Sequence, residues 1–281
     1  MRFADVLEAY ALSLRARGRS PRTVDAYVRD VSKLKALGKP LGSIRAHHLE
    51  RLLADCTNQS TRNRMIASFK SFFDWVHRRG LVGSNPAAEL SGRTVRRTPR
   101  VVLSPEEVER VRVLLESCAD WLSVRDAAIV QMLWGVGLRV SELVGLDVGD
   151  VDLDGCRLFV RAKGDRRQVK VFGERARRAL ERWLSVRAQH DGHIDALFIS
   201  QKRTRMTARQ VQNILKRRFA EAGVDKPVHP HALRHSFATE LLRRTGNLRL
   251  VQKALGHASV TSTQVYTHIL AEDVRDAVAD L

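Results

Sequence analysis

Hydrophobic residues in the first 80 positions recur at helical spacing in four separate segments. The second segment opens at Ser20-Pro21, a helix-capping residue followed by a proline suited to a first turn. Glycines and an Asn-Pro pair end the fourth segment near position 86. The sequence therefore predicts four N-terminal helices. Their apolar positions are Phe3, Val6, Leu7, Tyr10 and Leu14; Val24, Tyr27, Val28, Val31 and Leu34; Leu49, Leu52 and Leu53; and Met65, Ile66, Phe69, Phe72, Phe73 and Val76.

The pattern breaks at residues 91–100, SGRTVRRTPR, which are polar and basic and show no apolar period. We interpret this stretch as a flexible linker, although a basic linker could also lie along a phosphate backbone. The predicted organisation is a helical domain at 1–90, a linker at 91–100 and a second domain at 101–281.

The second domain begins with Ser104, Pro105 and Glu107, the spacing of a helix cap, a first-turn proline and a capping-box partner. An apolar helix is expected at roughly 121–136, and a β-hairpin is expected where CRLFV and QVKVF flank AKGDRR. The fold class is thus mainly α with a small antiparallel β-sheet. Later helices are expected near 174–189, 208–222, 231–244, 248–255 and 271–279.

The charge of the chain points to a polyanionic partner. Its 281 residues carry 49 Lys and Arg against 31 Asp and Glu, a net charge of +18. Residues 1–100 hold 20 of those basic and 8 of those acidic side chains, so the first third is the more basic part. Nucleic acid is the usual partner of such a protein, and a merely soluble arginine-rich protein is the alternative.

Three widely spaced cysteines, Cys56, Cys118 and Cys156, indicate neither a disulfide framework nor a cysteine zinc site. The start, MRFADVLEAY, lacks the apolar core of a signal peptide. The longest apolar-rich run, AAIVQMLWGVGL, is shorter than the ~20 residues that span a bilayer. We therefore expect a cytoplasmic protein without a membrane partner.

Six polar residues of the second domain form a chemically coherent set, although each alone is more often a surface or structural residue. Two guanidinium groups can bind the non-bridging oxygens of a phosphate, and an ammonium group can protonate a leaving oxygen. A histidine can accept the proton of a phenol, whose ordinary pKa is ~10. Together they suit transfer of a phosphodiester to a tyrosine. The six are Arg139, Lys163, His231, Arg234, His257 and Tyr266.

These residues stand in the motifs GLRVSEL, AKGDRR, HPHALRHSFAT, LGHAS and STQVYTH. In order, residue type and spacing, the set resembles the tyrosine recombinases, which include Xer-type chromosome-dimer resolvases and phage integrases. The resemblance covers essentially the whole chain. It implies a SAM-like, DNA core-binding N-terminal domain, a catalytic second domain, Tyr266 as the nucleophile, and Glu142 as an acidic side chain that holds a catalytic neighbour in place.

The resemblance also implies partners. They are a double-stranded recombination site and a homotetramer on two duplexes, or a heterotetramer with a paralogue, located with the nucleoid and serving chromosome partition and cell division. The chemistry would need no metal, ATP or other cofactor. In such proteins the last helix docks on a neighbouring subunit. The apolar stripe of residues 270–281 fits this role, and packing in its own core is the alternative.

Other functions stay open at this point. A phage or mobile-element integrase would carry the same residues, a type IB topoisomerase shares similar chemistry, and a DNA-binding regulator could retain the fold without catalysis. A metal site built from histidines is disfavoured because no carboxylate or thiolate cluster accompanies them; the five are His229, His231, His235, His257 and His268. Predicted DNA contacts are Arg62, Arg64, Lys70, Arg203 and Arg209.

Overall fold

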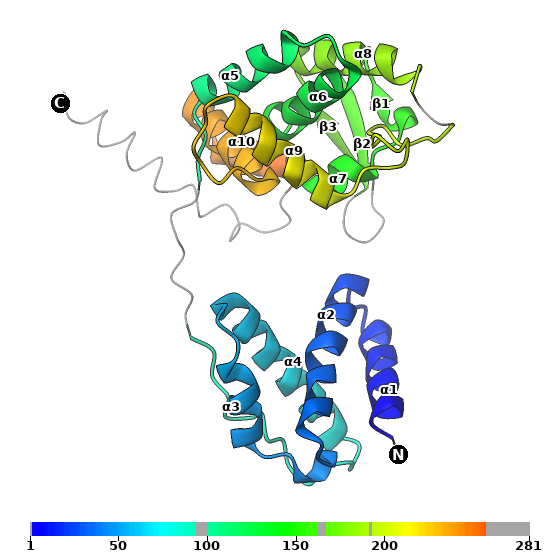
Figure 1. Ribbon diagram of the computed structural model, residues 1–281, viewed down its shortest axis with the longest axis vertical. Coiled ribbons are helices and arrows are strands. Elements are labelled where there is room, and N and C mark those ends of the chain that lie inside the picture. The colour runs from blue at the N-terminus through cyan, green and yellow to red at the C-terminus, as the bar shows by residue number, and fades with distance from the viewer. Residues whose placement is uncertain (1, 94–100, 162–166, 191–192, 257–281) are drawn as a thin grey trace, which may run out of the picture. The chain divides into compact units, whose positions relative to one another are not determined.

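The computed structural model describes residues 2–93, 101–161, 167–190 and 193–256. The chain divides into two compact units, Met1–Thr98 and Pro99–Leu281 (Figure 1). Each unit has its own hydrophobic core. Among the described residues, no helix has the length and apolar character needed to cross a membrane.

The N-terminal unit is helical, as its apolar spacing predicts. Its helices are α1 (Phe3–Ala16), α2 (Pro21–Ser32), α3 (Ala46–Ala54) and α4 (Gln59–His77), with two short 3₁₀ turns, η1 (Lys33–Leu37) and η2 (Leu41–Ser43), between α2 and α3. The side chain of Ser20 accepts a hydrogen bond from Thr23 N and caps α2, whose first residue is Pro21. Aromatic residues of α4 fill the centre of this core together with Tyr10.

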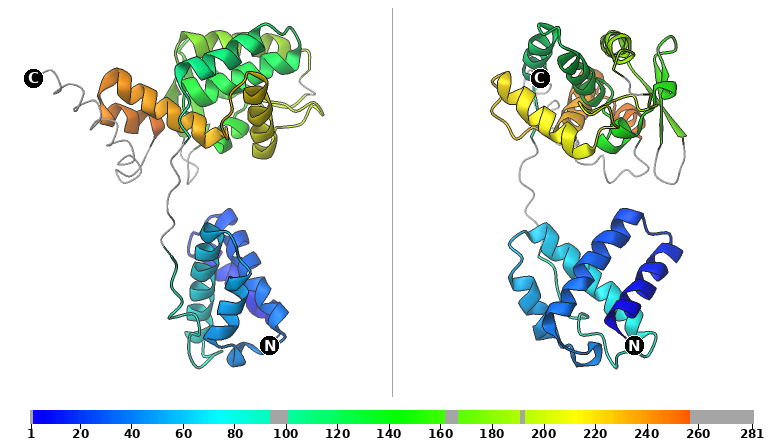
Figure 2. Two further views of the ribbon diagram at one scale, coloured as in Figure 1. Left: turned by 60° about the vertical axis from the view of Figure 1, so that its left-hand side comes forward. Right: turned by 45° about the vertical axis from the view of Figure 1, so that its right-hand side comes forward.

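The C-terminal unit packs helices beside a small sheet (Figure 2, right). Its first elements are α5 (Pro105–Glu116), α6 (Trp121–Gly135), α7 (Val140–Gly145) and η3 (Val148–Asp150). The strands β1 (Val151–Asp152), β2 (Arg157–Arg161) and β3 (Arg167–Val171) form an antiparallel sheet in the order β1-β2-β3. The helices α8 (Glu174–Arg187), α9 (Ala208–Glu221), α10 (Pro230–Thr245) and α11 (Leu248–Leu255) follow. The predicted mainly α fold with a small antiparallel sheet is confirmed.

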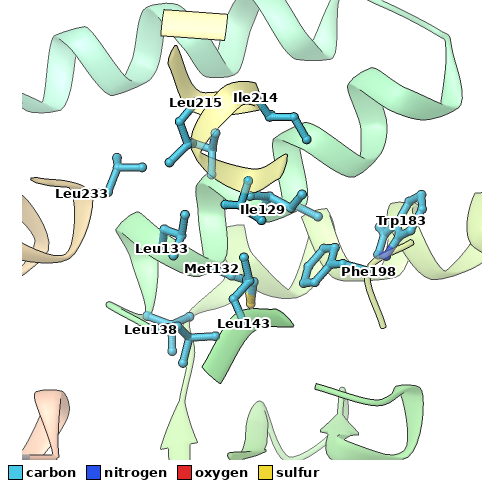
Figure 3. Close-up of a cluster of buried hydrophobic side chains, with 14 of the residues drawn as sticks. Ile129, Met132, Leu133, Leu138, Leu143, Trp183, Phe198, Ile214, Leu215 and Leu233 are labelled. Atoms are coloured by element: carbon cyan, nitrogen blue, oxygen red, sulfur yellow. The ribbon is translucent and has the colours of Figure 1, made fainter. Parts of the chain in front are cut away.

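The core of this unit forms around α6, which is apolar around most of its circumference. Figure 3 shows Leu138 and Leu143 beside Met132 of α6. These two leucines flank the loop and first turn that contain Arg139, so their burial fixes the backbone at that arginine. A separate small cluster joins α10 to α11 through Ala238, Leu242, Val251 and Leu255.

Candidate active site

A glycine-dependent turn places Arg139 at the start of α7. Gly137 has a left-handed backbone, with φ +68°, and a Cβ atom built there would lie 2.3 Å from Cδ1 of Phe237. Only glycine fits this position without displacing the ring. The turn redirects the chain after α6, so that Arg139 becomes the N-cap residue of α7 with its side chain 37% exposed.

Glu142 holds Arg139 by two hydrogen bonds. Its Oε2 accepts from the Arg139 backbone N at 2.8 Å, and its Oε1 accepts from Arg139 Nη1 at 2.6 Å. The carboxylate side chain is only 4% exposed. Charge-assisted bonds of this kind restrict a long side chain to few conformations. The two bonds hold Arg139 in one orientation, and the supporting role of Glu142 in catalysis stays a prediction.

Arg234 reaches the same carboxylate from α10. Its Nη1 lies 3.7 Å from Glu142 Oε2, and its side chain is 8% exposed. The guanidinium also donates to the backbone oxygens of Gly137 and, at 2.7 Å, Leu255. It thereby ties together the turn before α7 and the end of α11. Arg139 and Arg234, distant in sequence, thus converge on Glu142.

His231 lies in the first turn of α10, one helical turn before Arg234, and is exposed. The N-cap residue of this helix is His229, whose Nδ1 accepts a hydrogen bond from Ala232 N at 3.1 Å. Pro230 occupies the first helical position. The capping fixes where α10 begins, and the three-residue spacing places His231 and Arg234 on one side of it.

The other three residues of the predicted set, Lys163, His257 and Tyr266, lie outside the described residues. So does the final helix expected at 271–279. Their catalytic roles stay predictions. His268 also lies outside the described residues, whereas His235 is buried in α10. No group of three His, Cys, Asp or Glu side chains in the described part of the chain could hold a metal ion.

Sequence reasoning missed Lys170, a buried lysine of β3 beside these arginines. Burial lowers the pKa of Lys170 to about 8, with Glu142 opposing the shift and Arg234 and Arg139 adding to it. The sequence around Lys170 gives little indication of its burial, because a lysine between two valines in a strand normally faces solvent. Its side chain nevertheless belongs to the same charged cluster.

The charges in this cluster do not balance. Among the residues that the structure describes, Arg139, Arg234 and a charged Lys170 lie around one carboxylate, that of Glu142. The excess positive charge is partly shielded from water. In such a site the attraction for an anion is stronger than it is in bulk solvent. Two guanidinium forks with an orienting carboxylate form a site suited to a phosphate group.

The predicted DNA contacts lie on both units. Arg62, Arg64 and Lys70 are partly exposed on α4, and Arg64 Nη2 forms an ion pair at 3.1 Å with the buried Asp30. Because this pair restrains Arg64, only the rest of its guanidinium can reach a phosphate. In the C-terminal unit, Arg203 and Arg209 are exposed. These five roles stay predictions.

The sequence matches known proteins along most of its length. Residues 102–273 match the model of the phage integrase family, and residues 7–80 match the phage integrase N-terminal SAM-like domain. The tyrosine recombinase XerC of Alcanivorax borkumensis is 37% identical over 262 residues, which cover 89% of this chain and 84% of the relative. The XerC of Pseudomonas syringae pv. tomato is 38% identical over 276 residues, covering 94% and 91%.

Solved structures show the same fold. The XerH site-specific recombinase bound to a palindromic difH substrate, a post-cleavage complex, aligns with a TM-score of 0.76 at 22% identity over 94% of this chain and 81% of that one. A lambda integrase dimer bound to a COC′ core site aligns with a TM-score of 0.71 at 19% identity over 95% of both chains. A XerA recombinase is 28% identical with a TM-score of 0.58, covering 98% and 99%.

Proposed function

Because this chain belongs to the phage integrase family as a Xer-like site-specific recombinase, we propose that it cuts and rejoins double-stranded DNA through a 3′-phosphotyrosyl intermediate. The observation that supports this reaction best is the convergence of Arg139 and Arg234 on Glu142. Such an arrangement holds two guanidinium groups ready for one phosphate before the DNA arrives.

In the proposed cleavage step, the Tyr266 hydroxyl oxygen attacks a backbone phosphorus, and the bond from phosphorus to the 5′ oxygen breaks. His231 accepts the phenolic proton or hydrogen-bonds the phenol, and Lys163 donates a proton to the departing 5′ oxygen. One phosphodiester replaces another of similar energy. The step therefore needs no ATP, and the set of residues includes no group that would require a metal.

In the same step, Arg139, Arg234 and His257 bind the phosphate oxygens and stabilise the charge of the pentacoordinate transition state. Glu142 keeps Arg139 in place, as its two hydrogen bonds indicate. Strand exchange is the reverse reaction with a different nucleophile. The 5′-hydroxyl of a partner strand attacks the phosphotyrosine, releases Tyr266 and restores the DNA backbone.

The test begins with a binding site selected from a randomised duplex library. A duplex carrying that site, with a nick that lets the short 5′-hydroxyl fragment diffuse away, is incubated with the purified chain. We expect a covalent complex that survives SDS, is removed by protease, and carries the DNA through its 3′ end. Tight binding without any covalent complex would favour the alternative of a DNA-binding regulator that lacks catalysis.

A second assay, with two intact duplexes of different length that both carry the site, separates recombination from simple resealing. A recombinase joins strands from two different duplexes that carry the site, whereas a type IB topoisomerase reseals the strand that it cut. We propose the first outcome, and chromosome or plasmid dimer resolution rather than phage or mobile-element integration as the cellular role. Such a role would place the protein in the cytoplasm with the nucleoid.

DNA affinity should fall steeply with salt. We propose that residues 1–90 bind the core site, that residues 91–100 connect the units and that residues 101–281 perform the chemistry.

Contacts to 6–10 phosphates would lower DNA affinity about 10³–10⁵-fold between ~50 and ~200 mM salt. Replacing Arg209, which is exposed, by Gln should reduce the slope of log affinity against log salt by about 1.

Arg178→Gln is the matched control, because Arg178 is similarly exposed but is paired with Glu174 on α8. Titration of a fluorescent duplex at several salt concentrations measures both slopes. An Arg209→Gln variant with the wild-type slope would exclude Arg209 from the phosphate contacts.

Removing residues 271–281 should affect assembly more than binding. We propose a homotetramer on two duplexes, or a heterotetramer with a paralogue, in which this segment docks on a neighbouring subunit. The truncated chain should then occupy a single half-site with nearly the wild-type affinity but should lose cooperativity at a paired site. Gel shifts with one and two half-sites measure both quantities. Equal losses in both would instead indicate packing within its own subunit.

A further inference from the structure

Lys170 occupies a position that lysine rarely takes. It pairs with Leu158 of β2 in the antiparallel register and is only 3% exposed, whereas Val169 and Val171 on either side of it face outward. The inner face of the hairpin otherwise carries the buried Leu158 and Val160. Burying an ammonium group among such residues costs free energy unless the group is paired, so a lysine here needs specific partners.

The main partner of Lys170 is the end of α11. Its Nζ donates a hydrogen bond to the backbone oxygen of Ala254. Arg234 donates to the next backbone oxygen, that of Leu255. The last carbonyls of a helix have no partners within the helix and carry partial negative charge, so two cations there satisfy and stabilise the helix end.

The contact between β3 and α11 is close. Gly256, which ends α11 with φ +65°, would place a Cβ atom within 2.4 Å of the Gln168 amide group. Gln168 and Lys170 lie two residues apart, on one face of β3. The inner face of the strand therefore meets the helix end at two successive positions. His257 is the next residue in the chain, and the segment that leads to Tyr266 begins there.

We propose that Lys170 is a positioning residue that, with Arg234, anchors the end of α11 and so fixes the backbone at Gly256, directly before His257 in the sequence. The inference rests on the proposed function for its catalytic consequence, but the anchor itself is a property of the fold. Lys170 does not touch DNA in this proposal, because its side chain is buried and its donor faces Ala254.

The charge on Lys170 strengthens the anchor. In the described ranges, the charged groups that act on it are Glu142 of α7, Arg139 at the start of α7 and Arg234 of α10. Because burial brings the pKa of Lys170 to about 8, its ammonium loses a proton as the pH rises through 8. A neutral amine donates a weaker hydrogen bond than an ammonium group. The anchor should therefore be strongest below pH 8 and weaken above it.

The test compares Lys170→Met with Lys253→Met. Methionine keeps the length of the side chain without the charge. Lys253, an exposed lysine of α11, serves as the matched control. Amide hydrogen exchange is followed in peptides covering 248–256, without DNA. We expect exchange at the end of α11 to accelerate about tenfold or more in Lys170→Met and to be unchanged in Lys253→Met.

Two further readouts distinguish positioning from general stability. Single-turnover cleavage of the nicked duplex should fall about tenfold or more in Lys170→Met at unchanged DNA affinity. In the wild type, the protection of α11 from exchange, corrected for the intrinsic exchange rate, should decrease as the pH rises above 8. Lys170→Met should not show this decrease. The exchange readout needs no cleavage, so a failure of the proposed reaction leaves the anchor testable.

Exchange and cleavage at wild-type rates in Lys170→Met would overturn the proposal. A loss of DNA affinity equal to the loss of cleavage would also overturn it, because Lys170 would then act in binding. Should the methionine variant fail to fold, Lys170→Arg takes its place, since arginine retains a charged donor. Preserved protection of α11 in that variant supports the anchor, and lost protection in a folded variant contradicts it.

Discussion

A Tyr266→Phe variant is expected to form no covalent complex with DNA while binding the same duplex with nearly wild-type affinity. The substitution removes a single oxygen atom, the one that the proposed mechanism makes the nucleophile, and phenylalanine offers no replacement. Affinity is expected to survive because it depends chiefly on basic residues that contact phosphates. The measurement is SDS-resistant complex formation on the nicked duplex, beside a titration of DNA binding.

The other two tyrosines of the chain provide matched controls. Tyr10 is buried in the N-terminal unit, where its hydroxyl donates to Ser71 Oγ at 2.9 Å. Burial raises the pKa of Tyr10 to about 12, which disfavours a phenolate there. Neither Tyr10 nor Tyr27 belongs to the proposed catalytic set, so Tyr10→Phe and Tyr27→Phe should both form the covalent complex with DNA. A complex that persists in Tyr266→Phe, or disappears in Tyr27→Phe, would show that the nucleophile is assigned to the wrong residue.

The helices were predictable because their boundaries are encoded locally. Ser104, Pro105 and Glu107 predict the start of α5, and the structure shows Ser104 as the N-cap residue with a complete capping box. Strand β1 escaped prediction because two residues are too few to show an alternating pattern. Val151 and Asp152 are extended because they pair with β2, which is a tertiary contact.

The charged cluster was only partly predictable. The motifs identify Arg139 and Arg234, but their meeting at Glu142 depends on how α7 and α10 pack, which no local pattern encodes. Lys170 shows most clearly what a local sequence pattern cannot predict. The alternation in β3 favours burying Val169 and Val171, yet the structure buries the lysine and exposes both valines. The contact with Ala254 accounts for that choice, and it joins residues far apart in sequence.

Replacing Arg139 by alanine should lower the single-turnover cleavage rate about 10²–10³-fold, the usual effect of removing one preorganised donor to a developing anion. Arg139 suits the experiment better than Arg234, because Arg234 also holds the backbone oxygens of Gly137 and Leu255, so that its loss would disturb the fold as well. Among the described residues, the Arg139 side chain is hydrogen-bonded only to Glu142, and it is partly exposed. Its removal should therefore leave the thermal melting temperature within a few degrees of the wild-type value.

Arg177→Ala is the matched control for this experiment. Arg177 has nearly the same exposure, 34% of its side chain, and is also paired with carboxylates, those of Glu174 and Glu181 on α8. Its partners belong to α8 and not to the charged cluster, so its loss should leave the cleavage rate unchanged. Arg139→Lys extends the comparison, because lysine keeps the charge but not the planar fork that matches two phosphate oxygens. A rate for Arg139→Lys close to the wild-type value would mean that charge alone suffices there, and a wild-type rate for Arg139→Ala would remove this arginine from the mechanism.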